Sequence, residues 1–308
     1  MKTRIITGTL IGLVVAGFFG LRFVSPYLFD ILIGIIMLFG AGEVSKVFNR
    51  SGKHNNMTLA TMFPVALFIS ILLGIYFELS FGLVLLIELG VLLLFVLAVF
   101  IWTILDKKSK LEEKPLDEPV QNYVLKKVAM TTAIYAYPSI ILSMLFYINH
   151  IQDLKLVAET TANVGLFMLI ALFVTTMLTD VCAYFVGSTF KGKKLCPYIS
   201  PNKTISGAIG GLAGALVGSV LLYFVFMNLT GFADLFVNAH FSIWIMLVYA
   251  LFASVLSQAG DIFASWLKRT ARTKDFSTIF PGHGGFMDRC DGLAFNAVFT
   301  FIMLALIF

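Results

Sequence analysis

Residues 80–104 read SFGLVLLIELGVLLLFVLAVFIWTI and contain one ionisable side chain, Glu88. A helix needs about 20 predominantly apolar residues to cross the hydrocarbon core of a bilayer. Similar apolar runs recur along the chain, which is 59% hydrophobic and 13% charged. A soluble domain carries about 25% charged residues. The sequence therefore predicts an all-α polytopic membrane protein.

Hydropathy, together with interruptions by proline and polar clusters, places about nine transmembrane helices. They cover residues 4–22, 26–46, 57–77, 80–104, 128–149, 161–187, 205–228, 241–266 and 290–308. The first resembles a signal peptide, but no small-x-small cleavage site follows it, so we expect a retained helix. Three scattered cysteines are too few for a disulfide framework or a zinc site.

The basic residues predict the orientation of these helices. The N-terminus and the loops after the even-numbered helices hold 20 Lys and Arg residues, whereas the other loops and the C-terminus hold 2. Basic residues concentrate in cytoplasmic loops. The N-terminus and the even-numbered loops are therefore predicted to be cytoplasmic, and the C-terminus to lie outside.

This distribution also explains the net charge of +5. Cytoplasmic basic loops suit anionic lipid headgroups, so we expect a plasma-membrane location and no nucleic-acid partner. The largest cytoplasmic break is Asp106–Lys127, a solvated connector or an interfacial helix. It separates residues 1–127, whose role is unclear, from residues 128–308, where the polar chemistry is concentrated.

The densest polar segment is Gly260–Gly292, between the last two predicted helices. Asp261, Ser265, Lys268 and Arg269 follow helical spacing and share one face of a helix. A loop with Lys274 leads to the turn Pro281-Gly-His283-Gly284-Gly285, whose backbone can approach a phosphate closely. Asp288 and Asp291 follow, three residues apart, at the start of the last helix. Polar groups packed so densely between two membrane spans favour a functional site over isolated salt bridges.

A second polar cluster lies upstream. Asp180 falls inside an apolar helix, where an ionisable residue usually faces a partner or a water-filled cavity. Ser200-Pro-Asn-Lys203-Thr204 precedes a helix and is either an anion-binding corner or an ordinary N-cap. Glycines at small-xxx-small spacing follow from Gly207 to Gly218. They predict close helix packing, either within one chain or between two copies of a homodimer.

Carboxylates from two helices can hold Mg²⁺, which usually takes one or two carboxylates together with substrate phosphates. Such a site would hold one ion or a pair. The aspartates, cations and glycine turn therefore predict a site for a metal-bound nucleotide phosphate.

The segment SWLKRTARTKDFSTIFPGHGGFMDRCD at residues 265–291 closely resembles the long sequence pattern of the phosphatidate cytidylyltransferases, or CDP-diacylglycerol synthases. The blocks DVCAYFVG at 180–187 and SPNKT at 200–204 resemble that family in the same order. The resemblance covers the C-terminal 130 or so residues well, and the front half by hydropathy alone. It implies a nucleotidyltransferase of phospholipid biosynthesis, which converts CTP and phosphatidic acid to CDP-diacylglycerol and pyrophosphate.

The resemblance also implies roles for individual residues. The expected metal ligands are Asp261 and Asp288, with Asp291 and Asp180 as secondary ligands. The expected catalytic group is Asp261, Ser265, Lys268, Arg269 and Asp288. Substrate binding is expected from Ser200, Lys203, Thr204, Lys274, His283, Gly284, Gly285 and Arg289.

Two other functions stay open at this stage. One is a CTP-dependent enzyme acting on a prenyl lipid, such as a polyprenol kinase or an archaeol-type cytidylyltransferase. The other is an ion-coupled transporter, for which intramembrane charges and inverted repeats in both halves would be expected. The charges gather in the cytoplasmic loops of the back half, which disfavours transport.

Overall fold

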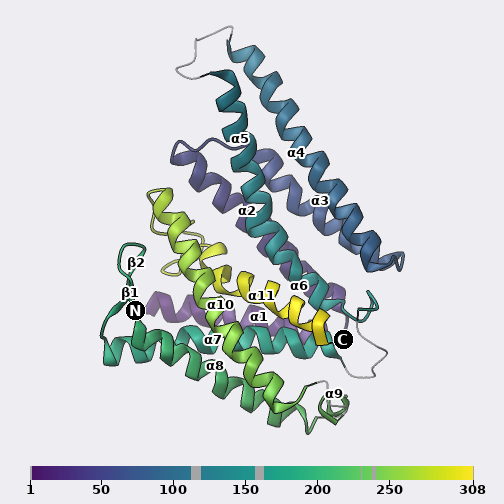
Figure 1. Ribbon diagram of the computed structural model, residues 1–308, viewed down its shortest axis with the longest axis vertical. Helices are drawn as coiled ribbons and strands as arrows, with labels where there is room; N and C mark the ends of the chain where they lie inside the picture. Colours follow the sequence, from purple (N-terminus) through teal and green to yellow (C-terminus); the bar gives the residue numbers. More distant parts are fainter. Residues whose placement is uncertain (1, 112–118, 157–162, 230, 238–240, 308) are drawn as a thin grey trace. The chain divides into compact units, whose positions relative to one another are not determined.

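The computed structural model describes residues 2–111, 119–156, 163–229, 231–237 and 241–307 (Figure 1). Within these residues, eight helices are long and apolar enough to cross a membrane. The predicted all-α polytopic fold is confirmed. The apolar part of the first helix, Ile6–Arg22, is shorter than the other eight spans.

The helices follow the predicted order. Their bounds are α1 Lys2–Arg22, α2 Pro26–Arg50, α3 Met57–Tyr76, α4 Phe81–Leu111, α5 Val120–Ile134, a π-helix Tyr135–Ile140, α6 Ile141–Asn149, α7 Val164–Phe190, α8 Ile205–Phe226, α9 Ala233–Val237, α10 Ile243–Thr270 and α11 Met287–Ile307. Two short strands, β1 Lys194–Cys196 and β2 Ser200–Thr204, pair antiparallel and were not predicted.

The predicted connector Asp106–Lys127 is more helical than expected, because α4 continues to Leu111 and α5 begins at Val120. Its middle, residues 112–118, lies outside the described residues. So do residues 161–162 and 308 of two predicted helices.

The chain forms two compact units. Unit 1 comprises Met1–Gly20, Tyr27–Ser143 and Ala271–Asp288, and unit 2 comprises Leu21–Pro26, Met144–Thr270 and Arg289–Phe308. These units follow contacts in space, whereas the predicted boundary at residue 127 concerns the division of roles and stays a prediction.

Helices α3, α4 and α5 pack together in unit 1 (Figure 1). The buried Phe63 ring lies against Tyr135 and Phe95, with centroid distances of 4.3 and 5.4 Å. Pro138 interrupts the helical path between α5 and α6, and Tyr137 before it leaves helical geometry. This follows from proline, which lacks a backbone donor and disfavours helical geometry in the preceding residue.

Glu43 fastens the loop before α11 to α2 in unit 1. Its carboxylate accepts hydrogen bonds from Ser277 Oγ at 2.6 Å, Phe286 N at 3.0 Å and Met287 N at 2.9 Å. The backbone N–H groups at a helix start have no partner within the helix, and a negative charge there is favourable. A Cβ on Gly285 would collide with this carboxylate, so a larger residue there would displace it. Glu43 thus fixes both the loop and the start of α11.

In unit 2, α8 packs along α7, and α10 packs on both (Figure 1). The glycine stripe of α8 permits this approach. A Cβ on Gly211 would lie 2.8 Å from the carbonyl oxygen of Thr179, and one on Gly214 would lie 2.5 Å from Cys182 Sγ. The close packing predicted from the stripe is therefore found within one chain.

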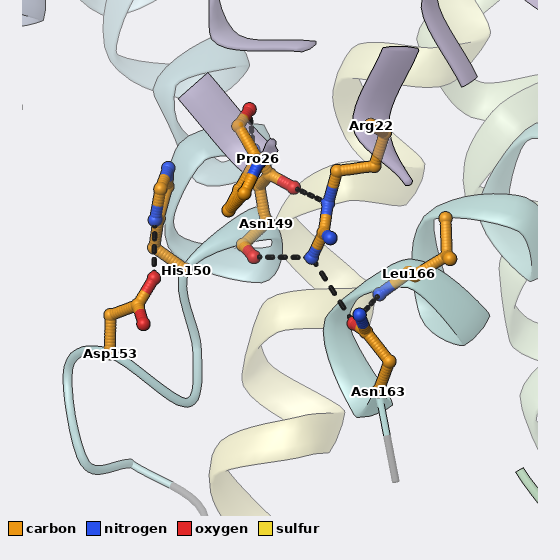
Figure 2. Close-up of polar contacts among 7 residues, drawn as sticks. All are labelled: Arg22, Pro26, Asn149, His150, Asp153, Asn163 and Leu166. Atoms are coloured by element: carbon orange, nitrogen blue, oxygen red, sulfur yellow. Dashed lines mark hydrogen bonds and ion pairs between the residues drawn. The ribbon is translucent and has the colours of Figure 1, made fainter. Parts of the chain in front are cut away.

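A buried arginine joins several chain segments of unit 2 (Figure 2). The guanidinium of Arg22 donates to Asn149 Oδ1 at 2.5 Å and to Asn163 Oδ1 at 3.1 Å. Asn149 Nδ2 donates to the carbonyl of Pro26 at 3.0 Å, and Asn163 caps α7 by accepting from Leu166 N. The end of α1 and the starts of α2 and α7 are therefore tied to the end of α6.

Gly211→Ala is expected to destabilise the protein by about 1–3 kcal/mol, because the methyl group meets backbone that cannot move alone. The melting temperature in detergent would measure the effect. Gly12→Ala is the matched control, because nothing lies within 4 Å of its Cβ position. Equal melting temperatures for the two variants would contradict the packing role of the stripe.

Glu43→Ala is expected to leave three donors without their acceptor and to loosen the loop at residues 271–286, at a cost of about 1–3 kcal/mol for each buried donor left unsatisfied. Trypsin cleavage at the exposed Arg272 and Lys274 should become faster. Glu78→Ala, at an exposed position, is the control. Cleavage at the wild-type rate in the Glu43 variant would refute this role.

Candidate active site

Three aspartates in unit 2 come from three different helices. Asp180 lies on α7, Asp261 on α10 and Asp291 on α11, and their carboxylates are within electrostatic range of one another. Gly260 makes part of this approach possible, because a Cβ there would lie 2.5 Å from the carbonyl oxygen of Asp291. The backbones of α10 and α11 therefore nearly touch beside two of the three acids.

Such a group of carboxylates needs positive charge beside it. Lys203 Nζ forms an ion pair with Asp261 Oδ2, and the two side chains are 24% and 33% exposed. The positive charge of Arg289 interacts electrostatically with the carboxylate of Asp180, and that of the buried Lys268 interacts with the carboxylate of Asp291. Three acids and three cations thus gather in unit 2, in a site that water can reach at the Asp261–Lys203 pair.

The β-hairpin carries Lys203 to this group. Lys194 pairs with Thr204, and Thr204 Oγ1 caps α8 by accepting from Gly207 N at 3.0 Å. Arg269, further along α10, donates from Nε to the carbonyl of Ile199 at 3.3 Å. Thr204 is therefore an N-cap, one of the two alternatives for this corner, and the anion-binding role of the corner stays a prediction.

The glycine turn of the polar segment belongs to unit 1. Asp288, which is 7% exposed, accepts hydrogen bonds at Oδ2 from Phe276 N at 2.8 Å and Gly285 N at 2.9 Å. Gly284 has a φ of +82°, a left-handed conformation that glycine adopts without strain. Asp288 therefore closes the loop, a role that the sequence did not indicate.

His283 lies in the same turn. Among the described residues, its buried Nδ1 atom has no hydrogen-bond partner. An unsatisfied buried nitrogen is costly, so this atom is suited to a ligand or a water molecule.

The predicted site residues are thus divided between the two units. Unit 2 holds Asp180, Ser200, Lys203, Thr204, Asp261, Ser265, Lys268, Arg269, Arg289 and Asp291, and unit 1 holds Lys274, His283, Gly284, Gly285 and Asp288. The pairing of Asp261 with Asp288 at a metal stays a prediction. Sequence reasoning assigned no role to Glu43, although an acid in an apolar helix is itself a signal.

The carboxylates of this site are candidate ligands for Mg²⁺. In the part of the chain that the structure describes, no three His, Cys, Asp or Glu side chains are grouped closely enough to hold a metal. Mg²⁺ typically takes one or two carboxylates, and substrate phosphates and water supply its other oxygen ligands. Asp261 with one neighbouring aspartate would meet that requirement.

Comparison with known proteins agrees with this chemistry. The sequence profile of the cytidylyltransferase family matches residues 2–307. A phosphatidate cytidylyltransferase of Brucella suis biovar 1 (strain 1330) is 39% identical over 142 residues, 46% of this chain and 48% of that protein.

Two further relatives carry the same name. That of Staphylococcus aureus (strain COL) is 40% identical over 136 residues, and that of Staphylococcus haemolyticus (strain JCSC1435) is 38% identical over 135. Each alignment covers 44% of this chain and 48% of the relative, so the matched region spans about half the length of these proteins. Because the family profile extends over nearly all its residues, the chain belongs to the cytidylyltransferase family.

Proposed function

We propose that this protein transfers the cytidylyl group of CTP to phosphatidic acid, forming CDP-diacylglycerol and pyrophosphate. Family membership and the names of the relatives support the reaction. The observation that carries the proposal is the grouping of three aspartates with Lys203, Lys268 and Arg289 in unit 2. Such a group suits a polyphosphate that brings its own negative charge and a metal ion.

The reaction does not require the protein to form a covalent bond with either substrate. An oxygen of the lipid phosphate is already anionic and attacks the α-phosphorus of CTP, while the bond to the leaving pyrophosphate breaks. The difficulty is to bring two anions together and to stabilise the charge on the leaving group. Lys203, Lys268 and Arg289 would offset that charge, and Ser265 would donate a hydrogen bond to a phosphate oxygen.

The fit of the donor set supports Mg²⁺ as the cofactor, as one ion or a pair. Asp261 is the leading candidate ligand, with Asp288, Asp291 and Asp180 as the other carboxylates. When bound, the ion would neutralise phosphate charge and polarise the phosphoryl oxygens. Lys203, paired with Asp261, would hold that carboxylate in position until CTP arrives.

The location of the site follows from the charge asymmetry of the loops. The segments with Lys203 and with Lys268–Arg289 both belong to the basic set of loops predicted to be cytoplasmic. We therefore propose a plasma-membrane enzyme of phospholipid biosynthesis with its site on the cytoplasmic face, where CTP is available.

The assay that tests the proposal uses the purified protein with labelled CTP, Mg²⁺ and a choice of lipid acceptors. Phosphatidic acid is expected to yield labelled CDP-diacylglycerol and pyrophosphate. A labelled product with a prenyl acceptor, and none with phosphatidic acid, would indicate the prenyl-lipid enzyme instead. No product with any acceptor would overturn the proposal.

Asp261→Asn is expected to reduce turnover by about a hundredfold or more, because the carboxylate serves the metal and orients Lys203. Binding of Mn²⁺, followed by electron paramagnetic resonance, should weaken in parallel. Asp106→Asn, which removes an acid paired with Lys127 elsewhere in the chain, is the control. Normal turnover in a folded Asp261 variant would exclude its role.

Asp288→Asn separates two roles of that residue. If Asp288 is a metal ligand, the variant should need about tenfold more Mg²⁺ for half-maximal activity. If Asp288 only closes the loop, the variant should have an unchanged Mg²⁺ requirement and a lower melting temperature. The first result is expected, and the second would remove Asp288 from the metal site.

A further inference from the structure

A groove in unit 1 lies outside the aspartate cluster. It has a volume of about 970 Å³ and is lined by α2, the start of α3 and residues 271–279. Most of this wall comes from the front half of the chain and from the loop held by Glu43. The sequence assigned the α2 residues of this wall no role.

The groove is rich in cations. Lys46 and Arg50 lie one turn apart on α2, and Arg272 and Lys274 line the loop side. All four are exposed, and the ion pairs found among the described residues involve other cations. Two acids also line the groove: Asp275 is exposed on the loop, whereas Glu43 is 5% exposed and its carboxylate accepts the three hydrogen bonds of the loop. The four cations outnumber these two acids. The groove is therefore a site of net positive charge.

The same groove has an apolar end. Leu38 and Phe39 on α2 are 37% and 45% exposed, and Ile279 on the loop is 48% exposed. From Leu38 to Arg50 the helix rises about 18 Å, at 1.5 Å per residue. The α2 wall thus changes from apolar to cationic over about the length of a lipid headgroup and the first part of its chains.

We propose that this groove binds the lipid acceptor of the reaction, with its phosphate monoester on the cations and its acyl chains along the apolar end. This proposal rests on the proposed function and adds a binding site to it. A phosphate monoester carries up to two negative charges and several acceptor oxygens, which arginine can bind in pairs. Arg50 on α2 and Arg272 on the loop are the leading contacts.

A nucleotide phosphate has the same anionic chemistry, but the apolar end favours the lipid. A triphosphate and its ribose gain no binding free energy from contact with exposed leucine, phenylalanine and isoleucine side chains. A diacyl phosphate gains from both ends, because burying its chains removes apolar surface from water. α2 would therefore supply the lipid site, which gives the front half of the chain a function.

The test compares Arg50→Gln and Arg272→Gln with Lys53→Gln. Lys53 is an exposed cation three residues beyond Arg50 that does not line the groove. Binding of dioctanoyl phosphatidic acid and of CTP to the purified full-length protein would be measured separately by calorimetry. Losing one charged contact should weaken phosphatidic acid binding about tenfold and leave CTP binding unchanged. The Lys53 variant should bind both as the wild type does.

A second variant tests the apolar end. Ile279→Ser is expected to weaken binding of dioctanoyl phosphatidic acid more than that of the dihexanoyl form, because the longer chains bury more apolar surface. An equal effect on both chain lengths would contradict the placement of the acyl chains.

Each remaining outcome is decisive. Weaker CTP binding in the arginine variants would make the groove a nucleotide site, and unchanged binding of both ligands would overturn the proposal. Binding is measured without turnover, so it tests the lipid site separately from the proposed reaction. Groove-dependent phosphatidic acid binding in a protein that makes no CDP-diacylglycerol would refute the function and keep the lipid site.

Discussion

An ionisable side chain in an apolar helix is stable where another polar group satisfies it, and much of this structure follows from that constraint. Glu43 on α2 accepts three donors from the loop before α11. Asp261 on α10 is paired with Lys203, which lies on the hairpin that connects α7 and α8. Asp288 takes two backbone donors of its own loop. The acids thus organise the polar segments beside the apolar helices.

The two units use this chemistry differently. In unit 2, acids and cations come close together with part of their surface accessible, which suits a group that receives and releases a charged substrate. In unit 1, Glu43 and Asp288 are buried and their carboxylates accept hydrogen bonds from the loop, whereas the four cations of the groove are exposed. The proposed transfer between a water-soluble triphosphate and a membrane lipid would use both kinds of site: one for a polyanion with its metal, and one for an amphiphile.

Hydropathy predicted the helices well because each span must be apolar whatever its neighbours are. Spacing along α10 predicted which residues share a face, and the Ser200–Thr204 corner was located although its strand was not. The role of Glu43 could not be found in this way, because its partner Ser277 lies 234 positions away and no local pattern encodes that contact. The sequence left open whether the connector is solvated or helical, and charged residues extend α4 and α5 into it beyond their apolar parts. The glycine stripe indicated close packing, but its partner helix became known from the structure.

Arg22 has a consequence for the predicted orientation of this chain. It is one of two basic residues outside the 20 that are predicted to be cytoplasmic, and as a topogenic charge it counts against the predicted orientation. However, it is 6% exposed, and its guanidinium donates to the side-chain and backbone oxygens of Asn149 and to Asn163. In the folded protein, the guanidinium keeps its charge but is buried among these oxygens and is not presented to lipid headgroups. Lys155, which is exposed, is the other basic residue of this set, so in the predicted orientation the surface charge of the folded protein is more one-sided than the residue count suggests.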